Sequence, residues 1–416
     1  MSDCDCSASA AASGLISLEQ ALDLLLGHAR PVDGVERVSL SEALGRVLAE
    51  PVTSGINMPP WDNSAMDGYA VNTGDLTADG LRLPVSQRIP AGASGEPLAA
   101  GTAARIFTGA PVPAGADAVV IQEFCTVDAD HVVVCRVPEA GANIRRAGED
   151  TRKGDQVLPA GTRLGPQHLG LVASVGVAQL TVRRRMKVAL FSSGDELVMP
   201  GQPLGPGQIY NSNEFTLEGL LRNIGCDLVK MGIVEDTYEA TCEALRQAAQ
   251  QADLIMTSGG VSVGEEDHIK PAVEALGSLD LWKIAIRPGK PLAFGHIGDV
   301  PFIGTPGNPV SLFVTYCLFA RPFILKSLGV TQGLTPTPLT AQIDCDWPRP
   351  DKRREFARAQ LLTDQDGVAR VKLFRSRSSG VLSSLAWANG LAVLPEGRPL
   401  KRGERVQFLP FNELLT

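Results

Sequence analysis

The stretch LIMTSGGVSVGEEDHIKPAVEAL, residues 254–276, holds an apolar run, a glycine-rich turn and an amphipathic run in that order. Leu254–Thr257 is short and apolar, which predicts a buried strand. Ile269–Leu276 has apolar residues at helical spacing, so we expect a helix there. Glycines allow a tight turn and a close backbone approach between the two elements. This order of strand, turn and helix favours an α/β sheet.

The same alternation extends over residues 183–330. Apolar runs predict further strands at 188–191, 228–234 and 300–303. Helical spacing predicts helices at 213–224, 237–250, 269–276 and 309–325. We therefore expect a central three-layer α/β domain with a mostly parallel sheet covered by helices.

The rest of the chain predicts a multidomain protein that combines α/β and β folds. Residues 15–50 and 151–182 are interpreted as one helical/mixed domain, with a second short helix at Ser41–Leu48. Residues 51–150 are rich in Gly and Pro between short apolar runs, which indicates an inserted β-rich domain. Residues 331–416 predict a small C-terminal β domain, and residues 1–14 a disordered tail.

Composition excludes several classes of protein. The formal net charge is −8, which argues against nucleic acid as the main partner. The eight cysteines are scattered, which argues against a disulfide framework. The longest apolar stretch, Val310–Ala320, is far shorter than a membrane-spanning helix, and no secretory signal is visible. We expect a cytoplasmic protein without a membrane partner.

Acidic residues follow three of the predicted strands. Glu196, Asp236 and Asp267 each stand just beyond a strand end. In an open α/β sheet, ligands bind at the carboxyl ends of the strands. Mg²⁺ prefers a few carboxylates together with substrate phosphates, so the set predicts a magnesium site. Each acid taken alone is equally well explained as a charge at a helix N-terminus.

Two turns at the same edge suit anions. Glycine-rich turns and helix N-termini present backbone N–H groups to phosphates, although either turn alone is also typical of an ordinary strand-to-helix connection. The candidate ligand-binding residues are Ser258, Gly259, Gly260, Ser262 and Gly264 in the first turn, and Pro306, Gly307, Asn308 and Pro309 in the second.

A cationic run lies between these turns. Lys283, Arg287 and Lys290 are candidates for holding an oxyanion, with Arg as the bidentate fork. If residues 283–287 form one strand, Lys283 and Arg287 share a face. A solvated edge strand is the alternative explanation.

The sequence resembles the molybdopterin molybdenumtransferase family, which includes bacterial MoeA and the E domain of gephyrin. The resemblance covers the chain from about residue 15 onward. It rests on MPPWDNSAMDGYAV (58–71), FTGAPVPAGADAVV (107–120), NIRRAGED (143–150), ALFSSGDEL (189–197), TSGGVSVGEEDHIK (257–270), RPGKP (287–291) and GTPGNPVS (304–311).

The resemblance implies an elongated homodimer that takes adenylylated molybdopterin and molybdate and, with Mg²⁺, releases AMP and forms molybdenum cofactor. It implies that Asp67 and Thr108 of the β-rich domain join the α/β residues of the other subunit. Arg358 and Ser379 match functional positions of the last domain. Candidate further partners are molybdopterin adenylyltransferase and the molybdoenzymes that receive the cofactor.

The sequence departs from the family pattern at two positions, and two alternative functions are considered. Arg287 stands where the family commonly has Lys, and Asn211 where it commonly has Asp. One alternative function is a molybdopterin adenylyltransferase, but that enzyme is typically a single small domain. The other is a scaffold homologue, but this chain lacks a long linker or an attached adenylyltransferase domain.

Overall fold

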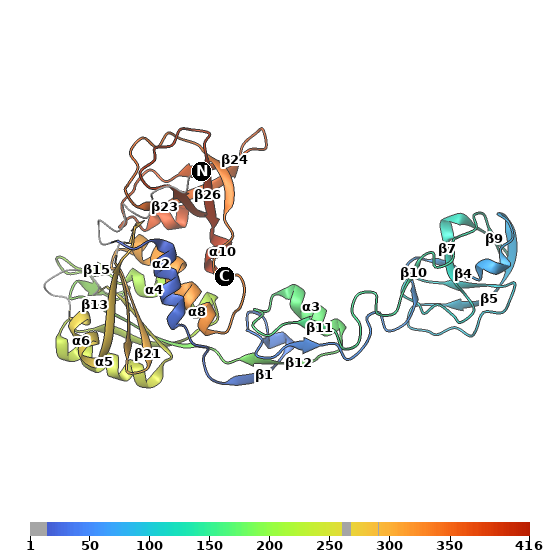
Figure 1. Cartoon of the computed structure of the whole chain (residues 1–416), viewed down its shortest axis with the longest axis horizontal. Helices are drawn as coiled ribbons and strands as arrows, with labels where there is room; N and C mark the ends of the chain where they lie inside the picture. Colours follow the sequence, from blue (N-terminus) through green and yellow to red (C-terminus); the bar gives the residue numbers. More distant parts are fainter. Residues whose placement is uncertain (1–14, 260–267, 290) are drawn as a thin grey trace, which may run out of the picture.

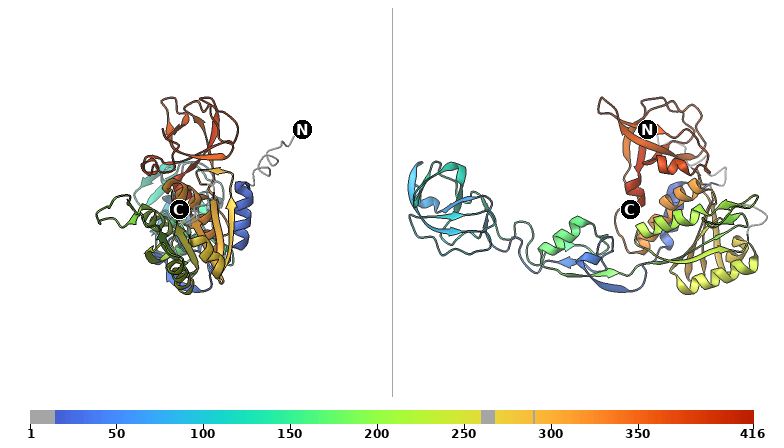
Figure 2. Two further views of the ribbon diagram at one scale, coloured as in Figure 1. Left: turned by 90° about the vertical axis from the view of Figure 1, so that its left-hand side faces the viewer. Right: turned by 180° about the vertical axis from the view of Figure 1, so that it is seen from behind.

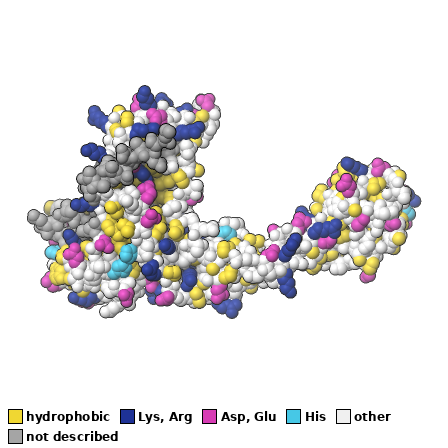
Figure 3. Space-filling view, viewed as in Figure 1, with side chains coloured by type: hydrophobic (Ala, Val, Ile, Leu, Met, Phe, Trp, Pro, Cys, Tyr) yellow, Lys and Arg dark blue, Asp and Glu magenta, His cyan; other side chains and the backbone are white. Residues whose placement is uncertain are grey.

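The structure is a computed structural model that describes residues 15–259, 268–289 and 291–416. The chain is elongated, with the α/β and C-terminal parts at one end and a β-rich part at the other (Figure 1). A slender middle part joins them, and two further views show the same extended shape (Figure 2). The predicted tail, residues 1–14, lies outside the described residues. Positive and negative side chains are interspersed over the face that Figure 3 shows.

The central part is the predicted α/β fold. Its sheet has the spatial order β16 (Asp227–Val234), β13 (Lys187–Ser193), β17 (Leu254–Ser258), β21 (Val300–Thr305), β20 (Pro291–Ile297) and β18 (Gly277–Lys283). The first four strands are parallel, whereas β20 and β18 pair antiparallel at one edge. A short parallel pair, β14 (Leu197–Val198) and β15 (Ile209–Tyr210), follows β13.

Helices cover both faces of this sheet, because side chains alternate along its strands. Val188 and Leu190 of β13 pack in the same core as α4 (Ser212–Asn223), whereas Ala189 and Phe191 pack with α5 (Tyr238–Gln251) and α6 (Ile269–Leu276). The result is the three-layer arrangement expected from the sequence.

One continuous helical stretch, Pro309–Ser327, runs through the first of these cores. It consists of α7 (Pro309–Thr315), a π-helical turn (Tyr316–Ala320) and α8 (Arg321–Ser327). By length and composition it could cross a membrane, but 94% of its most apolar window is buried inside the structure. Its apolar composition is therefore explained by packing in the core.

The N-terminal helix α2 (Leu18–His28) begins at a capping box formed by Ser17 and Gln20 and packs Ala21 and Leu25 into the same core. The prediction of a second short helix at Ser41–Leu48 is wrong. The structure has a 3₁₀ turn at Leu40–Glu42, after which Gly45 takes φ +75°, a left-handed conformation that ends helical structure.

The slender middle part consists of short elements. β1 (Val35–Ser39) pairs with β12 (Gln179–Arg183), and β2 (Val52–Thr53) pairs with β11 (Gln156–Leu158). The helix expected near residue 166 is α3 (Pro166–Ser174). These elements enclose a small core of their own that includes Leu48, Leu158, Val172 and Leu180.

The distal β-rich part is a sheet with one core on each face. Its strands in spatial order are β7 (Ala118–Ile121), β4 (Gly68–Val71), β6 (Ala103–Ile106), β5 (Leu81–Ile89), β9 (His131–Val134) and β8 (Cys125–Asp128). A ribbon of β3 (Asn63–Ser64) and β10 (Ile144–Arg145) and the 3₁₀ turns Thr73–Asp75 and Gln122–Phe124 complete it.

The C-terminal part is a barrel-like sheet that also contacts the α/β part. Its strands in spatial order are β19 (Ile286–Arg287), β23 (Arg354–Thr363), β24 (Ala369–Leu373), β22 (Leu339–Ile343), β26 (Arg405–Pro410) and β25 (Gly390–Leu394), and β25 also pairs with β23. The short helices α9 (Ser383–Trp387) and α10 (Phe411–Leu415) accompany it. In the sequence, β19 lies between β18 and β20 of the α/β sheet, although it pairs with the C-terminal sheet.

Candidate functional site

The polar turns predicted from the sequence meet along one edge of the α/β sheet. β16, β13, β17 and β21 are parallel neighbours, so their carboxyl ends lie side by side. Glu196 follows β13, Asp236 follows β16, Ser258–Gly259 ends β17, and Pro306–Pro309 follows β21. The strand order thus brings distant parts of the sequence to one edge of the sheet, the edge at which open α/β sheets bind their ligands.

Two of the predicted acids stand beside the end of β13. The hydroxyl of Ser193 donates a 2.8 Å hydrogen bond to Oδ1 of Asp236. The carboxylate of Glu196 folds back over Gly194, where an added Cβ would lie 2.5 Å from its Oε2. Gly194 has φ +146°, so a glycine is favoured here for its conformation.

The third predicted acid, Asp267, lies outside the described residues. No group of three or more His, Cys, Asp or Glu side chains poised to hold a metal ion occurs within residues 15–259, 268–289 and 291–416. Mg²⁺ in phosphate-transfer sites needs one or two carboxylates, with water and substrate supplying the other ligands. The donor chemistry of Glu196 and Asp236 fits that requirement.

The glycine turn and the second turn approach each other closely. The N–H of Gly259 donates to the carbonyl of Thr305 at 3.0 Å. A Cβ on Gly307 would lie 3.9 Å from Cα of Gly259, so the two backbones are adjacent. Gly259 itself has φ +88°. The remaining members of the predicted anion turn, Gly260, Ser262 and Gly264, lie outside the described residues.

The N-terminus of α7 lies at the same sheet edge, because α7 follows β21 after a short turn. Asn308 is the N-cap residue and Pro309 is the first helical residue, as the sequence predicts. The side chain of Asn308 makes no capping hydrogen bond to the helix. Asn213 of α4 donates from Nδ2 to the carbonyl of Gly307 at 2.7 Å, which fixes the turn before the helix.

The C-terminal part brings Ser379 to the same helix start. The N–H of Val310 donates to the carbonyl of Ser379 at 3.0 Å. Arg358, whose residue is 2% exposed, holds the loop that carries Ser379 by donating to the carbonyls of Ser376 and Ser378 at 2.7 and 3.0 Å. Burial lowers the pKa of this guanidinium below its ordinary value.

Lys283 and Arg287 do not share a face of one strand, contrary to the sequence-based prediction. Lys283 ends β18 at the edge of the α/β sheet. Ile284 then forms a bridge to Ile16, and Arg287 belongs to β19, which pairs in parallel with β23 of the C-terminal sheet. The chain leaves one sheet and enters another within four residues, so strand alternation does not relate the two side chains.

Arg287 is held by the C-terminal part. Its Nη1 donates to Oδ2 of Asp351 at 2.9 Å. Asp351 also accepts from the backbone N–H and from Nε of Arg353, at 3.0 and 3.1 Å. Burial raises the pKa of Asp351, but the hydrogen bonds from Arg353 and Arg287 outweigh it and lower that pKa to about 2. The predicted cation Lys290 lies outside the described residues.

Asp67 and Thr108 lie together at the distal end of the chain. The backbone N–H and the hydroxyl of Thr108 both donate to Oδ1 of Asp67, each at 2.8 Å. These hydrogen bonds lower the pKa of Asp67 below 3.8. Within one chain the pair is far from the α/β sheet edge, as Figure 1 shows.

Asn211, where the family commonly has Asp, has a structural role in this chain. It caps α4 by accepting from the N–H of Glu214, and its Nδ2 donates to Oε2 of Glu214 at 3.1 Å. Asn211 and Glu214 are both buried, at 1% and 2% exposure. An amide can donate to this carboxylate, whereas an ionised Asp would repel it.

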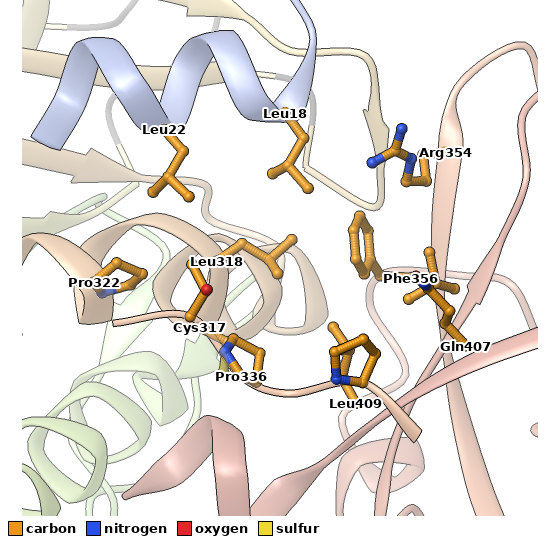
Figure 4. Close-up of a pocket in the computed structure, with 13 residues that line it drawn as sticks. Leu18, Leu22, Cys317, Leu318, Pro322, Pro336, Arg354, Phe356, Gln407 and Leu409 are labelled. Atoms are coloured by element: carbon orange, nitrogen blue, oxygen red, sulfur yellow. The ribbon is translucent and has the colours of Figure 1, made fainter. Parts of the chain in front are cut away.

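A separate apolar cavity of about 150 Å³ lies between α2, the long helical stretch and the C-terminal sheet. Figure 4 shows Leu18 and Leu22 of α2 opposite Leu318, with Phe356 and Leu409 of the C-terminal sheet at one end. None of the predicted site residues lines it.

Sequence reasoning missed Ser193, Asn213 and Asp351. Ser193 had a local signal, since it lies in the same polar turn as Glu196. Asn213 and Asp351 act on Gly307 and Arg287 across separations of 94 and 64 residues, and no local pattern marks such contacts.

Comparisons with known proteins agree with this architecture. Residues 16–176 match the family described as MoeA N-terminal region (domain I and II), 189–326 a probable molybdopterin binding domain, and 340–411 the MoeA C-terminal region (domain IV). The chain is 40% identical to a molybdopterin molybdenumtransferase of Haemophilus influenzae over 96% of this chain and 100% of that protein.

Further relatives and a solved structure extend the match. A Bacillus subtilis molybdopterin molybdenumtransferase is 34% identical over 93% of this chain and 92% of that protein. The crystal structure of the molybdopterin biosynthesis MoeA protein from Pyrococcus horikoshii OT3 is 31% identical, covers 95% of this chain and 100% of that one, and superposes with a TM-score of 0.80. The likeness spans every part of the fold described above, and the chain therefore belongs to the molybdopterin molybdenumtransferase family.

Proposed function

We propose that the chain inserts molybdenum from molybdate into adenylylated molybdopterin, with Mg²⁺, and releases AMP. The proposal is supported above all by the convergence of acidic residues, a glycine turn and a helix N-terminus at one sheet edge. That edge combines the two environments that a phosphoanhydride needs, namely the positive end of a helix for its oxygens and carboxylates for a divalent cation. The relatives' printed names support the reaction class.

In this proposal, the positive dipole end of α7 binds the phosphates, because the N–H groups of Gly259 and Val310 already donate to the carbonyls of Thr305 and Ser379. Gly259, with a φ of +88° and no side chain, lets the ligand approach the turn closely. The carbonyl of Ser379 engages the N–H of Val310, which places the C-terminal loop across the helix start. Asn213 and Arg358 are then positioning residues, because each holds a turn at this sheet edge through a backbone carbonyl.

Lys283 and Arg287 would hold molybdate at the junction of the two sheets. Molybdate is a dianion, and its transfer from water is costly without compensating charges. Asp351 uses one N–H group of the Arg287 guanidinium, and the structure shows no acceptor within the described residues for its remaining donors. These donors are free to bind an oxyanion in the bidentate manner of arginine.

Glu196 and Asp236 would hold Mg²⁺ together with Asp267. When bound, the ion supplies Lewis acidity to the phosphoanhydride. Ser193 orients Asp236 by donating to Oδ1. Oδ2 of Asp236 has no protein donor within the described residues, so this oxygen is available as a metal ligand.

Asp67 and Thr108 would reach this sheet edge from a second copy of the chain. The elongated shape separates them from the sheet edge of their own chain. A two-fold dimer in which each distal part meets the partner's α/β part would complete two equivalent sites. We expect this dimer in the cytoplasm, with molybdopterin adenylyltransferase and molybdoenzymes as transient partners.

The test is AMP release from purified adenylylated molybdopterin. We expect release that depends on both molybdate and Mg²⁺ and that yields molybdenum cofactor. AMP release that is indifferent to molybdate would contradict the proposal. An enzyme that instead converts ATP and molybdopterin to pyrophosphate and the adenylylated pterin would be the alternative adenylyltransferase.

A further inference from the structure

Two arginines of the distal sheet lie side by side on neighbouring parallel strands. The register of β5 and β6 pairs Arg88 directly with Arg105. Their guanidinium carbons lie 4.5 and 4.7 Å from the centroid of the same ring, that of Phe107. Like charges at adjacent positions of a sheet repel each other. The ring offsets part of that repulsion by cation–π attraction, but it supplies no negative charge.

Neither arginine has a carboxylate partner within the described residues. Arg105 donates to the carbonyl of Gly68 at 3.2 Å and to the amide oxygen of Gln122 at 2.8 Å. Arg88 makes no hydrogen bond or salt bridge there, and its side chain is exposed. Neutral acceptors thus hold Arg105 in place without neutralising it, and the charge of Arg88 faces solvent.

Within the described residues, Asp67 and Glu123 form no ion pair with either arginine. Oδ1 of Asp67 accepts both hydrogen bonds of Thr108. Glu123 accepts a long hydrogen bond, at 3.4 Å, from the amide of Gln122. Arg105 donates to the carbonyl of Gly68, the residue after Asp67, so Arg105 is a neighbour of the Asp67–Thr108 pair.

We propose that Arg88 and Arg105 bind a phosphate group of the adenylylated pterin. The inference rests on the proposed function and adds a second phosphate contact to it, on the β-rich part. One guanidinium group can donate two parallel hydrogen bonds to a phosphate. Two adjacent guanidinium groups therefore suit an anhydride that carries a charge on each phosphate. Phe107 contacts both guanidinium groups and directly precedes Thr108, so the bound ligand would lie next to the Asp67–Thr108 pair.

The test compares Arg88→Gln, Arg105→Gln and Arg105→Lys in the full-length chain. Arg82→Gln is the matched control, because Arg82 lies on the same strand as Arg88 but is paired with Asp128 at 2.9 Å. Binding of adenylylated molybdopterin is measured by equilibrium dialysis without molybdate. The half-saturating concentrations of the pterin and of molybdate are measured separately by AMP release.

Loss of a charge-assisted contact predicts that Arg105→Gln weakens pterin binding about tenfold to a hundredfold. Arg88→Gln, which removes a more exposed contact, should weaken it about threefold to tenfold. Arg105→Lys should lie between Arg105→Gln and wild type. Molybdate dependence should stay unchanged in every variant, and Arg82→Gln should behave as wild type in both assays.

Three outcomes would overturn the inference. The first is unchanged pterin binding in folded Arg88→Gln and Arg105→Gln proteins. The second is a change confined to molybdate dependence, which would assign the arginines to the other oxyanion. The third is a defect that disappears at protein concentrations restoring the dimer, measured by light scattering, which would make the pair a subunit contact. Arg88→Gln and Arg105→Gln could weaken pterin binding while the wild-type chain shows no molybdate-dependent AMP release. That result would support this phosphate site and refute the proposed function.

Discussion

Replacing Asp351 by Asn should weaken both the fold and molybdate binding, because this carboxylate joins Arg287 to the C-terminal part. The pKa of Asp351 is about 2, compared with 3.8 as its ordinary value. A difference of this size between the folded and unfolded chain corresponds to about 2 kcal/mol of stability at neutral pH. The side chain is 17% exposed, so solvent screens the interaction little.

The sign of the pH dependence follows from the lowered pKa. The ionised carboxylate favours the folded chain at every pH above about 4, and this contribution is lost as the pH falls through about 2. The difference in free energy of unfolding between wild type and Asp351→Asn should therefore be constant from pH 7 to 5 and shrink below pH 4. Urea titrations followed by tryptophan fluorescence measure it, since Trp347 and Trp387 lie in the C-terminal part.

Molybdate dependence separates a positioning role from a purely structural one. Asn accepts a hydrogen bond but carries no charge, so Arg287 should be held less firmly and half-saturating molybdate should rise about threefold to tenfold. Asp364→Asn is the control, because Asp364 pairs with Arg370 within the same sheet and does not contact Arg287. Equal molybdate dependence in the two variants, or unchanged stability of Asp351→Asn at pH 7, would refute the reasoning.

Three further predictions concern the proposed site. Lys283→Ala and Arg287→Ala should each raise half-saturating molybdate about tenfold to a hundredfold in the AMP-release assay; no change in either would place the anion elsewhere, with residues 258–264 as the next candidate. Asp267→Asn should sharply lower turnover while circular dichroism remains that of wild type, and normal turnover would remove Asp267 from the magnesium site. Light scattering should show a dimer at micromolar concentration, and a fully active monomer would contradict the shared site.

The α/β part could be predicted well because its elements are local and strongly patterned. The apolar runs at 188–191, 254–257 and 300–303 correspond to β13, β17 and β21. The antiparallel strands β20 and β18 were not predicted. Their sequences mix polar and apolar residues, and only pairing with β21 makes β20 part of the sheet.

The predicted positions of Glu196 and Asp236 beyond strand ends agree with the structure, whereas the predicted common strand for Lys283 and Arg287 is wrong. Strand ends place Glu196 and Asp236 together without knowledge of the tertiary fold beyond strand order. The relation between Lys283 and Arg287 depends instead on where the chain leaves one sheet for another. That choice is decided by pairing with Arg354 and Glu355, far along the sequence, which local alternation cannot reveal.

The contacts of the C-terminal part show how this sheet supports the α/β part. Asp351 holds Arg287, and the loop bearing Ser379 meets the start of α7. Both contacts act on groups at the proposed anion positions. The loop is held by Arg358, a buried guanidinium that donates to neutral acceptors, Ser384 Oγ among them. Removing Arg358 would leave those carbonyls without their donor and would release the loop. The C-terminal sheet therefore constrains both Arg287 and the start of α7, and in the proposed function this would hold the oxyanion beside the phosphoanhydride.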